Sequence, residues 1–167
     1  LAQKINLRDK EQDCQNSLEI YQLYEDGKKY RDTNGYQKSI EKFQKAIDLA
    51  RRISSKEHEV KCLRHLSLTY WELEDIKELY SLNEEALKIA NDLKFRKEQC
   101  RCLINIGLYY WKSSLYSKAL TYYERALKIA KEEKDKINEG VCFTNIGLVC
   151  LDLGNFNKAS DYLEKAL

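Results

Sequence analysis

The residues best able to do chemistry are six cysteines and two histidines. His58, Cys62 and His65 stand at i, i+4 and i+7, so a helix would place all three on one face. Imidazole and thiolate are the ligands that zinc prefers. The sequence offers no obvious fourth ligand nearby, so a zinc site is an alternative reading, and we expect neither a metal nor another cofactor.

The spacing of the cysteines favours a packing role instead. Cys62, Cys102 and Cys142 are forty residues apart, so they occupy one position in successive repeats, where a small apolar side chain fits. Cys100 and Cys102 would point about 200° apart around a helix, which is poor geometry for a shared metal. We expect buried thiols in a reducing compartment, and therefore a cytoplasmic protein.

The patterns of the common enzyme classes are missing from the sequence. Both histidines lie in one expected helix, so no nucleophile and base come from separate elements. The six glycines form neither a dinucleotide-binding nor a phosphate-binding motif. The net charge is only +2, the lysines and arginines form no stripe with interleaved aromatics, and no run of 18 apolar residues occurs. We expect no enzyme, no nucleic-acid partner and no membrane association.

The stretch 103–130 shows which elements position these residues. Leu103, Ile106, Gly107 and Tyr110 share one helical face, and a second apolar helix follows the polar break at 112–114. Helices joined by so short a turn lie antiparallel. The pattern recurs every forty residues, with small residues where the two helices would cross: Gly27, Ser67, Gly107 and Gly147 in the first helix, and Ala46, Ala86, Ala126 and Ala166 in the second.

These repeats predict an all-α chain with a polar stretch, 1–16, that we interpret as the tail of a preceding helix. Four units are expected at 17–56, 57–96, 97–136 and 137–167, the last one truncated. Their helices are expected at about 17–31 and 37–53, 58–73 and 76–92, 98–113 and 115–133, and 138–153 and 155–167. Gly154 stands where the last turn needs a positive φ.

A small residue followed three positions later by an aromatic, and then a small-x3-aromatic-x2-Ala run, resembles the tetratricopeptide repeat family. The likeness is closest to its long-repeat branch, found in Pins-type scaffolds, kinesin light chains and bacterial regulators. It implies a right-handed superhelical solenoid of antiparallel helix pairs. That family repeats about every 34 residues and closes each unit with a proline, whereas this chain has a forty-residue period and no proline. We therefore predict that the second helix is longer than usual and continues through segments such as 127–134. HEAT-like pairs share the period but lack these positions.

The resemblance implies that the first helices line a concave groove. The residues turned away from the expected core of each pair form the predicted site: Lys61, Arg64, Leu68, Trp71, Arg101, Ile104, Asn105, Leu108, Trp111, Asn145 and Leu148. Within it Leu68, Leu108 and Leu148 form an apolar ladder. Asn105 and Asn145 precede an Ile-Gly pair, as do family asparagines that hold the backbone of a bound peptide. The cations favour an acidic and hydrophobic peptide. Alternatively, the leucines pack between neighbouring helices, the tryptophans cap helix ends and the asparagines satisfy loop carbonyls.

The function predicted from these features is a protein-protein interaction scaffold that binds an extended peptide or a partner protein. The alternative is the regulatory or sensor arm of a larger effector, such as a bacterial caspase-like protease or a transcriptional regulator. The chain has no Met, and no polar helix covers its last unit. We therefore expect a parent protein that continues on both sides, or self-association through the uncovered ends.

Overall fold

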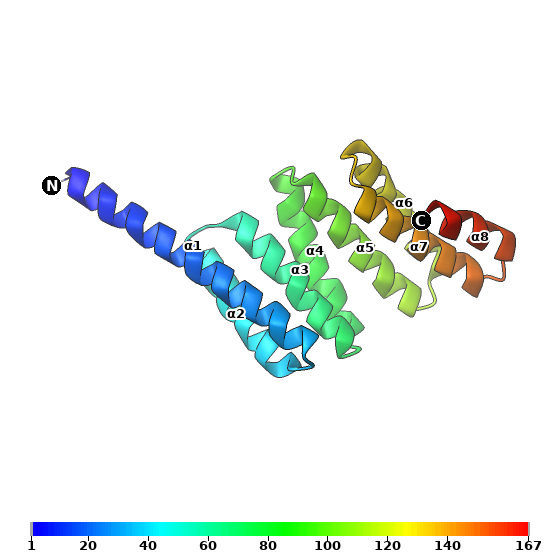
Figure 1. The fold of residues 1–167 in the computed structure, drawn as a ribbon, viewed down its shortest axis with the longest axis horizontal. Coiled ribbons are helices and arrows are strands. Elements are labelled where there is room, and N and C mark those ends of the chain that lie inside the picture. The colour runs from blue at the N-terminus through cyan, green and yellow to red at the C-terminus, as the bar shows by residue number, and fades with distance from the viewer. Residues whose placement is uncertain (1, 167) are drawn as a thin grey trace. The chain divides into compact units, whose positions relative to one another are not determined.

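The computed structural model describes residues 2–166, and their side chains from residue 11 onward. Figure 1 shows that this part of the chain consists of α-helices joined by short turns, without strands. The helices are α1 (Ala2–Asp32), α2 (Tyr36–Arg52), α3 (Lys56–Glu72), α4 (Ile76–Asp92), α5 (Arg96–Lys112), α6 (Tyr116–Glu132), α7 (Lys136–Asp152) and α8 (Phe156–Lys165). The all-α class predicted from the sequence is confirmed. None of the described helices combines the length and the apolar character needed to cross a membrane.

Helix length explains the forty-residue period. The helices α5 and α6 both contain 17 residues, and three-residue turns separate them from their neighbours. The six residues added to the usual repeat are therefore shared between the two helices and their turns. The predicted end of the second helix at 134 is two residues too late, since α6 ends at Glu132 and residues 133 and 134 lie in the following turn. The added length is also not confined to the second helix, because α5 is as long as α6.

The first helix differs from its predicted bounds. α1 runs for 31 residues without interruption, from Ala2 to Asp32. The interpretation of 1–16 as the tail of a separate preceding helix is therefore wrong for residues 2–16, and Leu1 lies outside the described residues. No glycine or proline stands near residue 17 to end a helix there, which accounts for the continuity.

Every turn has the same conformation. Each contains one residue with positive φ, and these residues recur every twenty positions: Asn34, Ser54, Glu74, Lys94, Ser114, Lys134 and Gly154. In the turn after α5, the Leu115 N–H donates to the Tyr110 carbonyl at 2.8 Å and the Ser114 N–H donates to the Trp111 carbonyl at 2.9 Å. This is the Schellman arrangement, which satisfies the last carbonyls of a helix. The positive φ predicted for Gly154 is confirmed, at 73°.

The chain divides into two compact units, Leu1–Asp75 and Ile76–Leu167. In the first unit, α2 packs against both α1 and α3. In the second unit, α4 to α8 pack in chain order, and the first helices α5 and α7 also touch each other (Figure 1). The second unit therefore places two first helices side by side.

The predicted small residues lie where the helices of a pair cross. A Cβ on Gly27 would lie 2.9 Å from Phe43 Cζ, and a Cβ on Gly147 would lie 2.9 Å from Leu163 Cγ. Gly107 faces the ring of Tyr123 in the same way, with a Cβ 2.7 Å from Tyr123 Cδ1. Such distances leave no room for a side chain, so glycine sets the closeness of these helix pairs.

Candidate binding face

The second unit carries seven of the predicted site residues. Leu108, Trp111, Asn145 and Leu148 are half-buried on α5 and α7, and the Arg101 side chain is 39% exposed. Helical spacing puts Leu148 on one stripe with Val141 and Leu151, each 39% exposed. We call the surface formed by Leu108, Trp111, Val141, Asn145, Leu148 and Leu151 the first-helix face.

Val141 and Leu151 were not among the predicted site residues, although their exposure is the largest on this stripe. They occupy the positions that Arg101 and Trp111 hold one repeat earlier. Val141 and Leu151 could therefore have been identified from the sequence by this forty-residue correspondence. The first-helix face is therefore more apolar on α7 than on α5.

Two predicted residues of the second unit lie in the core instead. Ile104 and Asn105 are each only 6% exposed. Asn105 Nδ2 donates to Asn83 Oδ1 at 3.1 Å, and Asn83 Nδ2 donates to the Leu79 carbonyl at 2.7 Å. Placement of Ile104 and Asn105 on an open groove surface is therefore wrong. For Asn105 the cause is Asn83, which stands where two of the other repeats have the aromatic residues Phe43 and Tyr123. Asn83 is a buried polar group, and Asn105 satisfies it.

Trp111 links the ends of α5 and α7. Its indole Nε1 donates to Asp152 Oδ2 at 2.6 Å. Asp152 is the last residue of α7, and nothing in the sequence distinguished it from any exposed acidic residue at a helix end. The indole thus meets the end of the neighbouring first helix through an acidic side chain, and not against the adjacent turn as in the alternative. Its ring remains half-buried, so the bond also holds an aromatic side chain at the edge of the first-helix face.

Asn145 differs from Asn105 in its surroundings. It is half-buried on α7, and its side-chain amide makes no hydrogen bond with any described residue. An amide in this state has both a donor and an acceptor for another molecule. Of the two predicted asparagines, Asn145 is thus the one that the fold leaves available.

In the first unit, α3 carries the remaining predicted residues. Leu68 and Trp71 are half-buried, and Lys61 Nζ lies 2.7 Å from Glu57 Oε1. Arg64 is only 8% exposed, so its predicted place on an open surface is wrong. Its guanidinium Nη2 lies 2.9 Å from His65 Nε2.

The histidines of the alternative zinc site have protein partners. His65 Nε2 lies 2.8 Å from the Tyr24 hydroxyl, and His58 Nδ1 lies 2.7 Å from Ser55 Oγ. Cys62 is 1% exposed. Among the described residues, no three or more His, Cys, Asp and Glu side chains come together as a metal site. The structure therefore does not assemble the three zinc ligands that the spacing suggested.

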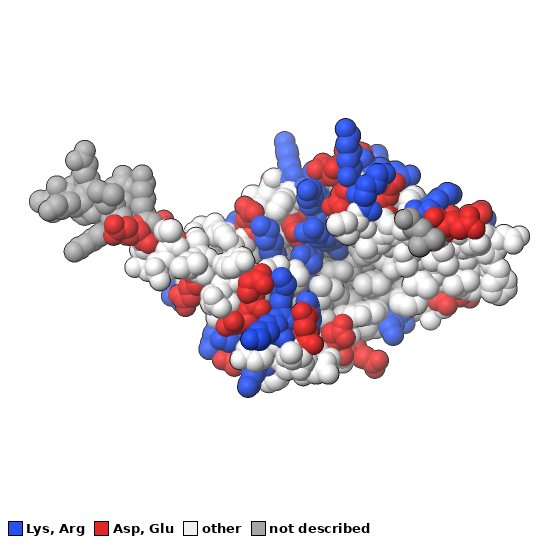
Figure 2. Space-filling model, viewed as in Figure 1, with Lys and Arg blue, Asp and Glu red and all other residues white. Residues whose placement is uncertain are grey.

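The predicted cations are partly neutralised within the chain. Arg101 Nη1 lies 2.6 Å from Glu98 Oε1, and Glu98 is buried. Figure 2 shows the side of the second unit on which α5 and α7 lie in front; it is mainly uncharged. Lysine and arginine side chains gather, together with acidic side chains, at the end of this unit where α5 and α7 begin. Charged side chains, cations among them, are therefore found at one end of the uncharged surface.

The prediction of core thiols is confirmed for Cys62, Cys102 and Cys142, which are at most 1% exposed, whereas Cys14 is exposed. Burial raises the pKa of Cys62 to about 12. A hydrogen bond between Cys100 and Cys142 lowers the pKa of Cys100 and raises the pKa of Cys142. Cys142 and Cys102 occupy equivalent positions in successive repeats. Where α5 meets α7, however, the neighbour of Cys142 is Cys100.

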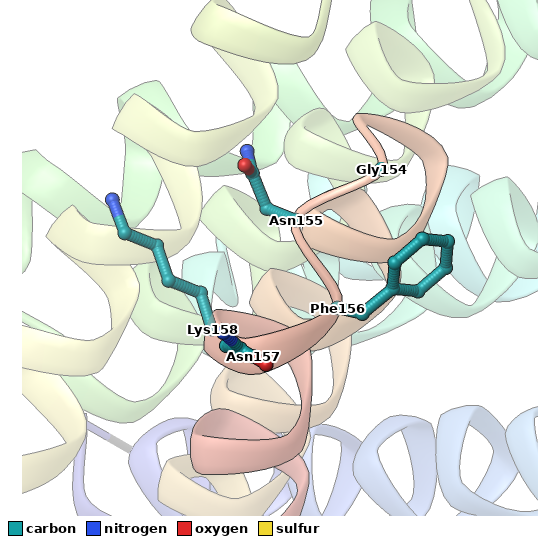
Figure 3. A pocket seen from close by; sticks show the side chains of 5 residues that line it. All are labelled: Gly154, Asn155, Phe156, Asn157 and Lys158. Carbon is teal, nitrogen blue, oxygen red and sulfur yellow. The ribbon is translucent and has the colours of Figure 1, made fainter.

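The turn between α7 and α8 contains an open hollow of about 350 Å³, lined by the residues from Gly154 to Lys158. In Figure 3 the side chains of Asn155, Phe156 and Lys158 point in three different directions. Side chains that diverge in this way do not converge on a ligand. The hollow therefore contributes nothing to the binding face.

Comparison with known proteins identifies the repeats. The sequence profile of the tetratricopeptide repeat matches residues 98–167. Among curated proteins, none matches the chain.

Solved structures with the same fold include aspartyl phosphate phosphatase F from Bacillus subtilis, with a TM-score of 0.81, 20% identity, and coverage of 88% of this chain and 39% of that one. The Rap conjugation gene regulator of plasmid pLS20, solved with the Phr* peptide, has a TM-score of 0.79, 18% identity, and coverage of 88% and 40%. The tetratricopeptide repeat domain of Arabidopsis FLU has a TM-score of 0.62, 21% identity, and coverage of 66% and 93%. This chain thus spans about two fifths of the first two proteins.

Proposed function

We propose that this chain is a protein-interaction scaffold whose first-helix face binds an extended peptide. The tetratricopeptide repeat profile matches residues 98–167, and 88% of the chain aligns with a solved structure of the same fold. The observation that carries the proposal is the apolar stripe on α7. Val141 and Leu151 are each 39% exposed, and half-buried Leu148 lies between them. Exposed apolar side chains in a continuous stripe are typical of interaction surfaces.

The rigidity of this face supports the proposal. α5 and α7 pack together and are joined by the hydrogen bond from Trp111 to Asp152 at 2.6 Å. A surface held in place before binding loses little conformational entropy when a flexible peptide docks. The ordering cost then falls mainly on the peptide.

The polar features of the face suggest how a peptide lies on it. Asn145 can donate to one peptide carbonyl and accept from one peptide N–H, which holds a backbone without selecting a side chain. Apolar side chains of the peptide lie against Leu108 and Leu148. Its acidic residues lie toward the beginnings of α5 and α7, where lysine and arginine side chains gather (Figure 2). The peptide is therefore acidic and hydrophobic, as expected from the sequence.

One solved structure with this fold contains a bound peptide. The pLS20 Rap regulator was solved in complex with the Phr* peptide, and 88% of this chain aligns with it. Its identity of 18% transfers the fold and not the ligand. The choice of a peptide for this chain therefore depends on the first-helix face itself.

The proposal is tested by selecting binders from a displayed library of random peptides and measuring their affinities by calorimetry. Val141→Asp and Leu151→Asp are expected to weaken the selected peptides by about tenfold or more, since each places an unpaired carboxylate on an apolar contact. Leu93→Asp is the matched control, because Leu93 is 47% exposed in the turn after α4 and lies outside the face. Equal affinities for all three variants would contradict the proposal.

A further inference from the structure

A second hollow lies in the unit Ile76–Leu167, where the second helices α4 and α6 both pack against α5. It has a volume of about 320 Å³ and shares no residue with the first-helix face. Leu87, Leu103 and Ile129 form its apolar floor and are each at most 9% exposed. This volume is within the range of small-ligand sites and is sufficient for a few side chains of a peptide. We call it the second-helix groove.

One end of the second-helix groove is fixed by hydrogen bonds. Gln99 is buried, and its Nε2 donates to the Ala90 carbonyl at 3.0 Å while its Oε1 accepts from Arg96 Nη1 at 3.1 Å. Arg96 also forms an ion pair with Glu132 on α6. Arg96 lies on α5 and Glu132 on α6, so their ion pair bridges the two helices and closes the groove here. The charges of Arg96 and Glu132 offset each other.

The α6 side of the groove carries positive charge that no carboxylate of the described residues neutralises. Arg125 and Lys128 are three positions apart on α6, both are exposed, and neither forms an ion pair with a described residue. Two such cations one helical turn apart attract a carboxylate that reaches the apolar floor between them and α4.

Aromatic rings lie beside Arg125. The guanidinium of Arg125 lies 5.2 Å from the centre of the Tyr122 ring. Tyr122 stacks on Tyr110 with ring centres 5.1 Å apart, and Tyr110 meets Tyr80 of α4 edge to face at 5.9 Å. All three rings are half-buried. Tyrosine and arginine are the residue types that dominate the energetics of protein interfaces.

We infer that the second-helix groove binds an acidic segment of a partner protein. The carboxylates of this segment pair with Arg125 and Lys128, and an apolar side chain next to them covers Leu103 and Ile129. Glu132, the acidic residue of the lining, is paired with Arg96, so Arg125 and Lys128 give the groove a net positive charge. This charge favours an acidic partner. The inference concerns a second surface, so it stands or falls independently of the first-helix face.

The test uses two fluorescein-labelled octapeptides, one of alternating Glu and Leu and one of alternating Lys and Leu, with binding followed by fluorescence anisotropy. The Glu-Leu peptide is expected to bind. In a chain whose first-helix face carries Val141→Asp, the double variant Arg125→Gln, Lys128→Gln is expected to weaken it by about tenfold. Lys158→Gln removes an exposed cation on α8 and is expected to leave the affinity unchanged. Circular dichroism checks that each variant keeps its helices.

Several results would overturn the inference. Absence of binding, or equal binding of the Lys-Leu peptide, would remove the charge selectivity. An unchanged affinity of the double variant, combined with loss of binding in Val141→Asp, would place the acidic peptide on the first-helix face and leave the proposed function intact. Displacement by inorganic phosphate at the concentration of the peptide would show a site for simple anions and not for a protein segment.

Discussion

Replacing Asn105 by alanine is expected to destabilise the chain, although the sequence pattern assigned this residue to peptide binding. Asn105 is 6% exposed and Asn83 is fully buried, and the amide of Asn105 donates to Asn83 Oδ1 at 3.1 Å. Loss of that donor leaves a buried carbonyl oxygen with one hydrogen bond fewer. Such a loss costs about 1–3 kcal/mol. In a chain of this size, each kcal/mol lowers the unfolding midpoint by about 2–4 °C.

The assay is urea unfolding followed by far-UV circular dichroism for Asn105→Ala, Asn83→Ala and the double variant. The double-mutant cycle is expected to give a coupling energy of at least about 0.5 kcal/mol, because the two side chains are in contact. Asn145→Ala is the control. Asn145 is half-buried without a hydrogen bond to a described residue, so its loss is expected to change the free energy of unfolding by less than about 0.5 kcal/mol.

A coupling energy of zero would refute this reasoning. So would an Asn105→Ala variant that keeps its stability but no longer binds a peptide selected by the wild-type chain, since Asn105 would then belong to the binding face. A destabilised Asn105→Ala variant beside a stable Asn145→Ala variant with weakened peptide binding is the expected pattern.

Other predictions concern the turns, the helix crossings and the thiols. Lys94→Gly is expected to raise the free energy of unfolding by up to about 1 kcal/mol, because Lys94 has a φ of 53°. Gly154→Ala is expected to lower it by about 1 kcal/mol, because Gly154 has a φ of 73°. Thermal unfolding measures both changes. Gly107→Ala forces a methyl group into the ring of Tyr123 and is expected to cost about 1–3 kcal/mol in urea unfolding, with part of the loss recovered when Tyr123 is also replaced by leucine. Ellman's reagent is expected to react rapidly with one of the six thiols, that of exposed Cys14, and with all six after unfolding; rapid reaction of a second thiol in the folded chain would contradict the burial of the others.

Burial of a thiol also makes stability depend on pH. The pKa of Cys62 is raised to about 12 in the folded chain, so the folded state holds its proton more tightly than the unfolded state does. This contribution is fully present below the ordinary thiol pKa of about 8.5 and is lost as the pH rises from there toward 12. Stability that rises over this range in the wild-type chain relative to Cys62→Ala would contradict the assignment.

The paired helices and their close crossings were predictable from the sequence because they follow from local rules. A small residue that recurs every forty residues opposite a larger side chain is a direct consequence of two helices crossing closely, as Gly107 and Tyr123 show. The extent of each helix was less accessible. Residues 2–16 have a polar composition that hides their continuity with α1, even though no residue there ends a helix.

The candidate site was only partly predictable, because burial depends on contacts between repeats. The position of Asn105 before Ile106 and Gly107 matches the family pattern. However, Asn105 donates its hydrogen bond to Asn83 on the preceding helix pair, and Asn83 departs from that pattern. The contact of Cys100 with Cys142 likewise depends on how α5 meets α7 and not on the period. Periodicity gives the face of a helix, and neighbouring helices decide which part of that face remains exposed.

Binding of a peptide across α5 and α7 can be followed by NMR titration of the labelled chain with a peptide selected from the library, recording the amide shift of each residue. We expect the largest shifts at Leu108, Val141, Asn145, Leu148 and Leu151. Shifts confined to α4 and α6, with these five residues unchanged, would contradict it.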